Sequence, residues 1–264
     1  MPELPEVESA RLVIALRALH LPISRVQAID PYVCRPFAAE DFRRLLIGHR
    51  LDRVDRVGKL LLLSVGGRSL GLHLGMGGRV VVTDAAGHVD RESDSTHGLA
   101  GPHRPQWDRL VLQFTDGTAL RLVDKRRLGR ATIDPDTTHL GPDALQITRT
   151  QFDAALLTGH RPVKARLLDQ ASISGIGNLV ADETLWRARV SPLHQTGALT
   201  RREVSALYRS MHAALNWALT HGGSHTGRLI PHRHQGGRCP RCDRQLSYAR
   251  VGGRSSWWCP EEQR

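Results

Sequence analysis

The chain has 264 residues, 40% hydrophobic residues and a formal net charge of +11 at pH 7. This length and apolar content indicate a folded protein of two domains with a small appendage and exclude a disordered chain. No stretch approaches the roughly 18 apolar residues that a membrane-spanning helix needs. The acidic start MPELPEVE is unlike a secretory signal, so we expect a cytoplasmic protein without membrane contacts.

The positive charge is almost entirely arginine. Of the 37 basic residues, only Lys59, Lys125 and Lys164 are lysines. A guanidinium group pairs with phosphate oxygens in a forked geometry, which favours a polyanionic partner such as nucleic acid. The alternative is that the genome is rich in G and C and therefore encodes arginine in place of lysine in every protein. The net charge alone does not distinguish this explanation from nucleic-acid binding.

Residues 5–19 are predicted to form a helix. Pro5 suits a first helical turn, and Leu12, Leu16 and Leu19 recur at helical spacing. The following region, to about residue 133, contains short apolar or alternating runs at 60–65, 79–82 and 109–114, with a hairpin turn at Asp116-Gly117. This pattern predicts a β-sandwich domain over residues 1–134.

A second region, residues 140–222, is predicted to be helical. Breaks at 134–136 and 141–142 precede it, and its helices are expected at 150–157, 162–170, 179–187 and 201–219. The tail, residues 235–264, is predicted to be a cysteine-bearing β-hairpin. The fold class is therefore α+β, and the polar stretch 87–106 is expected to be a surface loop.

The cysteines of the tail have metal-ligand spacing. Cys239 and Cys242 form one CxxC knuckle, and Cys259 follows after sixteen residues, with Glu262 where a second knuckle would have its second cysteine. A carboxylate is able to ligate zinc, so the spacing predicts a structural Zn²⁺ site of Cys239, Cys242, Cys259 and Glu262.

Two alternatives to this ligand set remain open. His232 or His234 could supply the fourth ligand instead of a carboxylate. A hairpin without metal is also possible, held together by Trp257, Trp258 and Leu246.

The segment 172–178, Ser-Ile-Ser-Gly-Ile-Gly-Asn, lies between two predicted helices. Small residues there allow backbone N–H groups to point outward at the start of the next helix, where they would bind a phosphate. Gly177 and Asn178 are the candidate residues. An ordinary helical hairpin is the competing interpretation.

The first residues suggest a nucleophile. Met1 precedes a small residue, so removal of the initiator would expose Pro2 as a secondary amine beside Glu3. An α-amino group has a pKa near 8, well below that of lysine, and is therefore a better nucleophile at neutral pH.

Five motifs in order give the chain a resemblance to the formamidopyrimidine-DNA glycosylase and endonuclease VIII family. They are residues 1–8, residues 73–78 (HLGMGG), residues 124–129 (DKRRLG), the 167–183 stretch and the cysteine hairpin. The resemblance covers nearly the whole chain, and the 167–183 stretch is similar to the family's helix–two-turns–helix element.

The resemblance implies a bifunctional glycosylase/AP lyase. Pro2 would attack C1′ of a damaged nucleoside to form a Schiff base that leads to β,δ-elimination, and Glu3 would act as general acid/base. Glu6 would organise the pocket, and Lys59 would contact the phosphates of the lesion.

The same comparison implies DNA contacts. Met76, Arg126 and Leu128 would fill the gap that a flipped nucleotide leaves. The resemblance also implies that Lys164, Asn178 and Arg254 bind phosphates, with Gly177 next to Asn178 at the start of a helix. The formamidopyrimidine branch has phenylalanine where this chain has Leu128, and Met76 and Leu128 could instead be core residues.

We therefore expect a monomeric, nucleoid-associated enzyme whose partner is double-stranded DNA with damaged bases or abasic sites. Two departures, the missing fourth cysteine and the unusual 222–237 loop, put 8-oxoguanine as the preferred lesion in doubt. The alternatives are a relative with shifted specificity and a non-catalytic damaged-DNA-binding protein. A third alternative, that the protein is a zinc-ribbon transcription factor, would account only for the cysteine-bearing tail.

Overall fold

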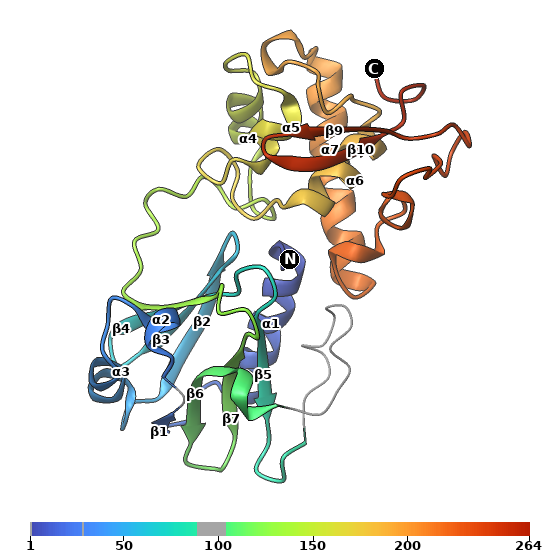
Figure 1. Ribbon diagram of the computed structural model, residues 1–264. Coiled ribbons are helices and arrows are strands. Elements are labelled where there is room, and N and C mark those ends of the chain that lie inside the picture. The colour runs from blue at the N-terminus through green and yellow to red at the C-terminus, as the bar shows by residue number, and fades with distance from the viewer. Residues whose placement is uncertain (1, 28, 89–103) are drawn as a thin grey trace. The chain divides into compact units, whose positions relative to one another are not determined.

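The structure is a computed structural model that describes residues 2–27, 29–88 and 104–264 (Figure 1). The chain divides into two compact units, the first ending at Thr137 and the second running from Thr138 to Arg264.

Unit 1 contains two four-stranded antiparallel sheets (Figure 1). One has the order β1-β6-β7-β5, with β1 at Ile23–Gln27, β6 at Asp108–Phe114, β7 at Ala119–Val123 and β5 at Arg79–Thr83. The other has the order β2-β3-β4-β8, with β2 at Leu51–Val57, β3 at Leu60–Val65, β4 at Arg68–His73 and β8 at Arg130–Ile133.

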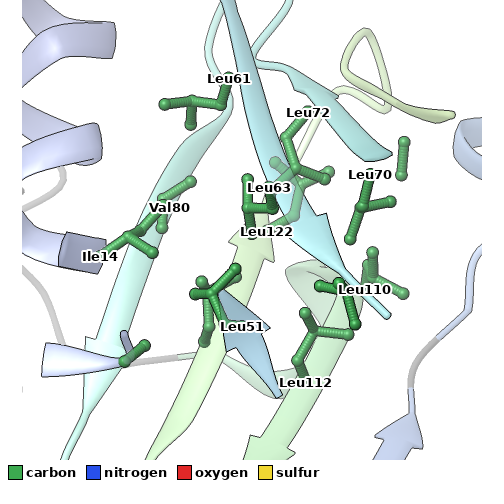
Figure 2. Packing of buried hydrophobic residues seen from close by; sticks show 14 of the residues in the cluster. Ile14, Leu51, Leu61, Leu63, Leu70, Leu72, Val80, Leu110, Leu112 and Leu122 are labelled. Atoms are coloured by element: carbon green, nitrogen blue, oxygen red, sulfur yellow. The ribbon is translucent and has the colours of Figure 1, made fainter. Parts of the chain in front are cut away.

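Side chains from both sheets share one hydrophobic core, which Figure 2 shows at close range. Leu61 and Leu63 of β3 and Leu110 and Leu112 of β6 all belong to this buried cluster, and their alternation along each strand places them on the inner face of their sheet. The predicted β-sandwich is therefore confirmed.

The leading helix, α1, spans Leu4–Arg17 and packs against the sandwich. Its buried face consists of Leu4, Val7, Ala10, Val13 and Ile14. Leu12 and Leu16, which carry the helical spacing in the sequence, are exposed instead. The helix was predicted correctly, but these leucines belong to its outer face because the sheets cover the opposite stripe.

The β6–β7 hairpin turns at Asp116-Gly117, as predicted. Gly117 has a φ of +90°, a conformation that glycine adopts without strain. The Asp116 carboxylate accepts a 2.9 Å hydrogen bond from the Thr118 amide, which closes the turn. Two short helices, α2 at Pro31–Cys34 and α3 at Ala39–Leu46, and a 3-10 turn at Pro105–Trp107 complete the described part of unit 1.

Unit 2 combines helices with a terminal hairpin (Figure 1). The helices are α4 at Arg149–Leu156, α5 at Val163–Leu168, α6 at Asn178–Ala188 and α7 at Arg201–Thr220. The hairpin pairs β9, Ser247–Val251, with β10, Arg254–Trp258. Short 3-10 turns lie at Thr196–Ala198, Ser224–Thr226 and Ile230–His232.

The α+β class and the terminal cysteine hairpin are confirmed. The hairpin groups with the helices because Leu246, Cys239 and Cys259 share a small core with Trp186 of α6. The division into three domains stays a prediction. Most of the expected surface loop at 87–106 lies outside the described residues, and within the described ones no helix is both long and apolar enough to cross a bilayer.

Candidate active site and DNA-binding elements

The predicted nucleophile and acid lie at the start of α1. Pro2, Glu3 and Glu6 are all buried. The Glu6 carboxylate accepts a 2.8 Å hydrogen bond from the backbone N–H of Glu3 and so caps the first turn. Glu6 thereby fixes the backbone that carries Pro2 and Glu3.

Lys59 lies in the turn between β2 and β3. Gly58, with a φ of +57°, allows the chain to reverse there. The Arg56 side chain lies under this turn, where its Nη1 donates to the Gly58 carbonyl at 2.8 Å and its Nε to the Glu8 carboxylate of α1 at 2.9 Å. This Glu8–Arg56 pair joins residues forty-eight positions apart, and the one signal of it in the sequence is an arginine three residues before Lys59.

His73 ends β4 directly opposite Leu60, the residue that follows Lys59. The pKa of His73 lies below its ordinary value because partial desolvation and the charges of Lys59 and Arg130 disfavour the protonated ring. Cationic side chains therefore converge at this end of the sheet, where an anion such as a phosphate would be stabilised.

The three predicted gap-filling residues come together. Met76 and Leu128 each expose 42% of their surface, so neither belongs to the core. Arg126 donates a 2.7 Å hydrogen bond from Nη2 to the Met76 carbonyl, which joins the two loops. Apolar side chains exposed in this way are suited to contact bases.

A buried carboxylate that the sequence analysis missed holds this second loop. Asp124 accepts hydrogen bonds from the backbone N–H groups of Arg126, Leu128 and Gly129 at 2.9, 2.7 and 2.7 Å. Its signal in the sequence is an aspartate two residues before Arg126, because an aspartate side chain often accepts a hydrogen bond from the backbone N–H two residues later in a turn. The loop is therefore pre-organised.

In unit 2, the 172–178 segment bends at Ile173 and Gly175 and leads into α6. Gly175 has a φ of +104°, and its amide donates at 3.0 Å to the side chain of Gln170, whose Nε2 donates to the Ile176 carbonyl at 3.0 Å. Gly177 is the N-cap and Asn178 the first residue of α6. The N-terminal amides of this helix are thus placed to bind an anion.

Lys164 is enclosed within unit 2. Its ammonium lies 2.6 Å from Asp182 Oδ1 and donates to the Ser255 carbonyl at 2.8 Å and to Ser256 Oγ at 2.7 Å, and the side chain is fully buried. Arg233 completes the cluster with a 2.8 Å bond to Asp182 Oδ2. A phosphate contact by Lys164 would require the ammonium to leave these partners.

This cluster ties the hairpin to the helices. Ser255 and Ser256 belong to β10, and Asp182 belongs to α6. Burial raises the pKa of Asp182, and the charges of Lys164 and Arg233 oppose that effect. Arg254, the first residue of β10, is exposed beside the cluster, as a phosphate-binding residue requires.

The three cysteines converge on one point. The Sγ atoms of Cys239, Cys242 and Cys259 lie within 4.8 Å of one another, with 3.4 Å between those of Cys242 and Cys259. Thiolates on a tetrahedral Zn²⁺ lie about 3.8 Å apart, given Zn–S bonds of about 2.3 Å. The three thiols therefore fit a zinc ion.

Glu262 lies near this cluster but is turned toward arginines. Its Oε2 is 3.4 Å from Arg189 Nη1 and 3.9 Å from Arg241 Nη1. The three thiols form the group of close ligand atoms, and the Glu262 carboxylate does not belong to it in this conformation. Its role as fourth ligand stays a prediction.

With this geometry established, the chain can be compared with known proteins. Residues 1–131 match the family model described as formamidopyrimidine-DNA glycosylase N-terminal domain, and residues 140–228 match the one described as formamidopyrimidine-DNA glycosylase H2TH domain. Together these matches cover far more than half of the chain. The chain belongs to the formamidopyrimidine-DNA glycosylase family.

Full-length relatives agree with this assignment. The chain is 34% identical to a formamidopyrimidine-DNA glycosylase of Roseiflexus sp., with 100% of both proteins covered. It is 32% identical to the one of Pelotomaculum thermopropionicum, with 98% of each covered.

Solved structures of the family superpose over the whole chain. They include Lactococcus lactis Fpg in complex with DNA containing N7-benzyl-Fapy-dG, with a TM-score of 0.82, 26% identity and 100% of both chains covered. MutM in complex with DNA containing carbocyclic 8-oxo-G gives a TM-score of 0.81 at 26% identity, again with 100% of both covered. The family resemblance of the sequence is confirmed.

Proposed function

We propose that this glycosylase-family chain is a bifunctional enzyme that excises damaged bases and then cleaves the strand through a Schiff base on Pro2. The observation that carries the proposal is the start of α1, where Pro2 and Glu3 are buried side by side and Glu6 fixes the backbone of Glu3 at 2.8 Å. A buried, immobilised terminus is what an N-terminal nucleophile requires, because its attack geometry must be defined.

The proposed chemistry begins once the initiator methionine is removed. The Pro2 nitrogen attacks C1′, the C1′–base bond breaks, and the base leaves with a proton. Glu3 supplies protons as the sugar ring opens, and the resulting iminium at Pro2 makes the C2′ proton acidic. Loss of that proton expels the 3′ phosphate, and a second elimination expels the 5′ phosphate.

The DNA-binding role is shared by both units. In unit 1, Lys59 and His73 would hold phosphates beside the lesion, while Met76 and Leu128 would occupy the space of the flipped nucleotide. In unit 2, the start of α6 and Arg254 would bind phosphates, and Lys164 would act by positioning β10, since its ammonium already has three partners there. The substrates are oxidised or ring-opened bases and abasic sites in duplex DNA.

The cysteine cluster would hold a structural zinc ion. Cys239, Cys242 and Cys259 supply three ligands, and Glu262 becomes the fourth if it exchanges its arginine contacts for the metal. The ion's contribution is folding energy for a hairpin that buries little apolar surface of its own. It takes no part in the reaction at Pro2.

Borohydride trapping on abasic duplex DNA tests the catalytic proposal, because reduction of the iminium leaves a covalent protein–DNA adduct. An extension that blocks the amino terminus should abolish trapping, and Pro2→Gly, which leaves a primary amine in place of the proline secondary amine, should slow it. Glu3→Gln should slow base excision by about 10²–10⁴-fold while nicking of a preformed abasic site falls less. Wild-type trapping by the blocked protein would assign the nucleophile to a lysine.

A further inference from the structure

Unit 1 carries an exposed aromatic ring surrounded by arginines that none of the roles above uses. Tyr32 of α2 exposes 45% of its surface. The guanidinium carbons of Arg35, Arg130 and Arg127 lie 3.8, 4.9 and 5.2 Å from the centre of its ring. Each is within the distance of about 6 Å at which a cation is attracted by an aromatic face. We call these four residues the Tyr32 surface.

A single carboxylate organises this surface. Asp30 caps α2 through a 2.9 Å bond from the Tyr32 amide, and it accepts both Nε and Nη2 of Arg127 at 2.8 Å. It also accepts a 3.3 Å bond from Arg109. Burial raises the pKa of Asp30, but the bonds from Arg127 and the backbone outweigh this and hold the pKa below its ordinary value. One anion thus fixes the backbone that carries the ring and holds one of its cations, Arg127, while the three arginines around the ring leave a positive excess.

The position of the surface follows from the sheet. At one end of the β2-β3-β4-β8 sheet, Lys59 precedes β3, His73 ends β4 and Arg130 begins β8, with Arg130 and His73 directly paired. Neighbouring strands lie about 4.8 Å apart, so Arg130 starts about 10 Å from the strand that follows Lys59. Lys59, His73 and Arg130 thus form a row across this end of the sheet. Since α2 packs against the edge strand β8, Tyr32 lies at the Arg130 end of the row.

This row is long enough to span the two strands of a duplex. The minor groove of B-DNA is about 6 Å wide, so a row of about 10 Å whose Lys59 end holds one strand extends to the other. Arg127 is also adjacent to Arg126 and Leu128, the residues proposed to fill the gap of the stack. With the damaged strand at Lys59, a surface next to that loop and on the side away from Lys59 would face the undamaged strand.

We propose that the Tyr32 surface binds the undamaged DNA strand opposite the lesion. The exposed guanidinium groups hold its phosphates, and the ring packs against a sugar or base, as aromatic side chains do on single strands. This inference rests on the proposed function, because Lys59 and the Arg126–Leu128 loop locate the two strands. It adds a strand-specific contact that keeps the partner strand in place while one nucleotide is flipped.

The test measures binding of the full-length protein to two DNAs by fluorescence anisotropy. One is an intact duplex with a stable abasic-site analogue, and the other lacks three nucleotides of the undamaged strand opposite that site. Arg35→Ala and Tyr32→Ala should each weaken binding to the intact duplex about 3–10-fold. Arg35→Ala should also lower the salt slope by about 0.9, the value for one phosphate contact.

Controls separate this contact from general electrostatics. Tyr32→Phe keeps the ring but removes the hydroxyl that hydrogen-bonds with Arg35 and Arg130, so it should weaken binding less than Tyr32→Ala does. Arg44→Ala removes an exposed arginine of α3, outside the Tyr32 surface, and should change affinity less than 2-fold. On the gapped DNA, Arg35→Ala and Tyr32→Ala should lose little relative to wild type, because the contacted strand is missing.

Equal losses on both DNAs, or equal effects of Arg35→Ala and Arg44→Ala, would overturn the proposal. Tight wild-type binding to the intact duplex without borohydride trapping would contradict the catalytic proposal alone. In that case, comparing the loss of affinity of Arg35→Ala and Tyr32→Ala on the intact duplex with their loss on the gapped duplex would still decide whether the Tyr32 surface binds the undamaged strand.

Discussion

Replacing Glu8 by glutamine removes the anion that neutralises Arg56 beneath the turn that carries Lys59. The Arg56 side chain is 4% exposed and that of Glu8 15%, so the pair is largely shielded from solvent. Breaking a buried ion pair by removing one partner costs about 3–5 kcal/mol. Because the glutamine oxygen still accepts one bond and some solvent reaches Glu8, we expect the free energy of unfolding of unit 1 to fall by about 2–3 kcal/mol.

The same substitution should affect DNA trapping. Arg56 donates to the Gly58 carbonyl at 2.8 Å, so an Arg56 side chain that loses the Glu8 carboxylate and shifts would displace the turn and Lys59 with it. Thermal unfolding should shift downward by about 5–10 °C. The rate of borohydride trapping should fall in Glu8→Gln, whereas adding Glu8→Gln to Lys59→Ala should cause no further loss of rate.

Arg11→Ala is the matched control. Arg11 lies on α1 rather than at the turn, pairs with the other oxygen of Glu8 at 2.7 Å, and is more exposed than Arg56. We expect a loss of less than about 1 kcal/mol and an unchanged trapping rate. If Glu8→Gln destabilised the protein no more than Arg11→Ala, or left trapping at the wild-type rate, the pair would have no positioning role.

The pH dependence of the stability follows from the pKa of the Glu8 carboxyl group. Burial raises the pKa of Glu8, but the bonds from Arg11 and Arg56 outweigh it, so the folded-state pKa lies below the ordinary value. Such a group stabilises the fold at pH values above its unfolded pKa of about 4.3 and loses that contribution as the pH falls through the folded pKa. The stability difference between wild type and Glu8→Gln should therefore be constant near pH 7 and shrink below about pH 4.

Two further predictions concern unit 2. Arg254→Ala should weaken binding to damaged and undamaged duplex alike and lower the salt slope by about 0.9; a loss confined to one lesion would instead assign Arg254 to base recognition. Metal analysis of the purified protein should find one zinc per chain, and Glu262→Cys should slow its removal by a chelator, because a fourth thiolate replaces a carboxylate that has to leave Arg189 and Arg241. If the purified protein contained no zinc and the hairpin were still ordered, the function of Glu262 would be to form ion pairs with Arg189 and Arg241 instead of binding metal.

Local sequence was sufficient for much of this protein. The Asp116-Gly117 turn follows from a residue that tolerates positive φ and a carboxylate that caps the next amide. The helix α7 begins at a Thr200–Glu203 capping box that the sequence contains in full. Five ordered motifs, among them the first eight residues and the cysteine hairpin, gave the family resemblance, because each motif depends on neighbours in the chain.

Tertiary structure decided what each side chain faces. Leu12 and Leu16 have core-like spacing but are exposed, because the sheets cover the opposite face of α1. Lys164 has the character of a surface cation but is buried against Asp182, which is eighteen residues away, and against β10, which is about ninety away. Such partners are brought together only by folding, and local propensity contains no information about them.

The arrangement of arginines is the clearest case of this limit. The sequence shows many arginines but not which of them a carboxylate neutralises. Arg127 is held by Asp30, ninety-seven positions earlier, and Arg56 by Glu8, forty-eight positions earlier. The free energy of each pair depends on distance and burial, both of which arise from the packing of distant segments. The sequence alone therefore determined that the protein is basic, and only the fold decided where that charge remains available to DNA.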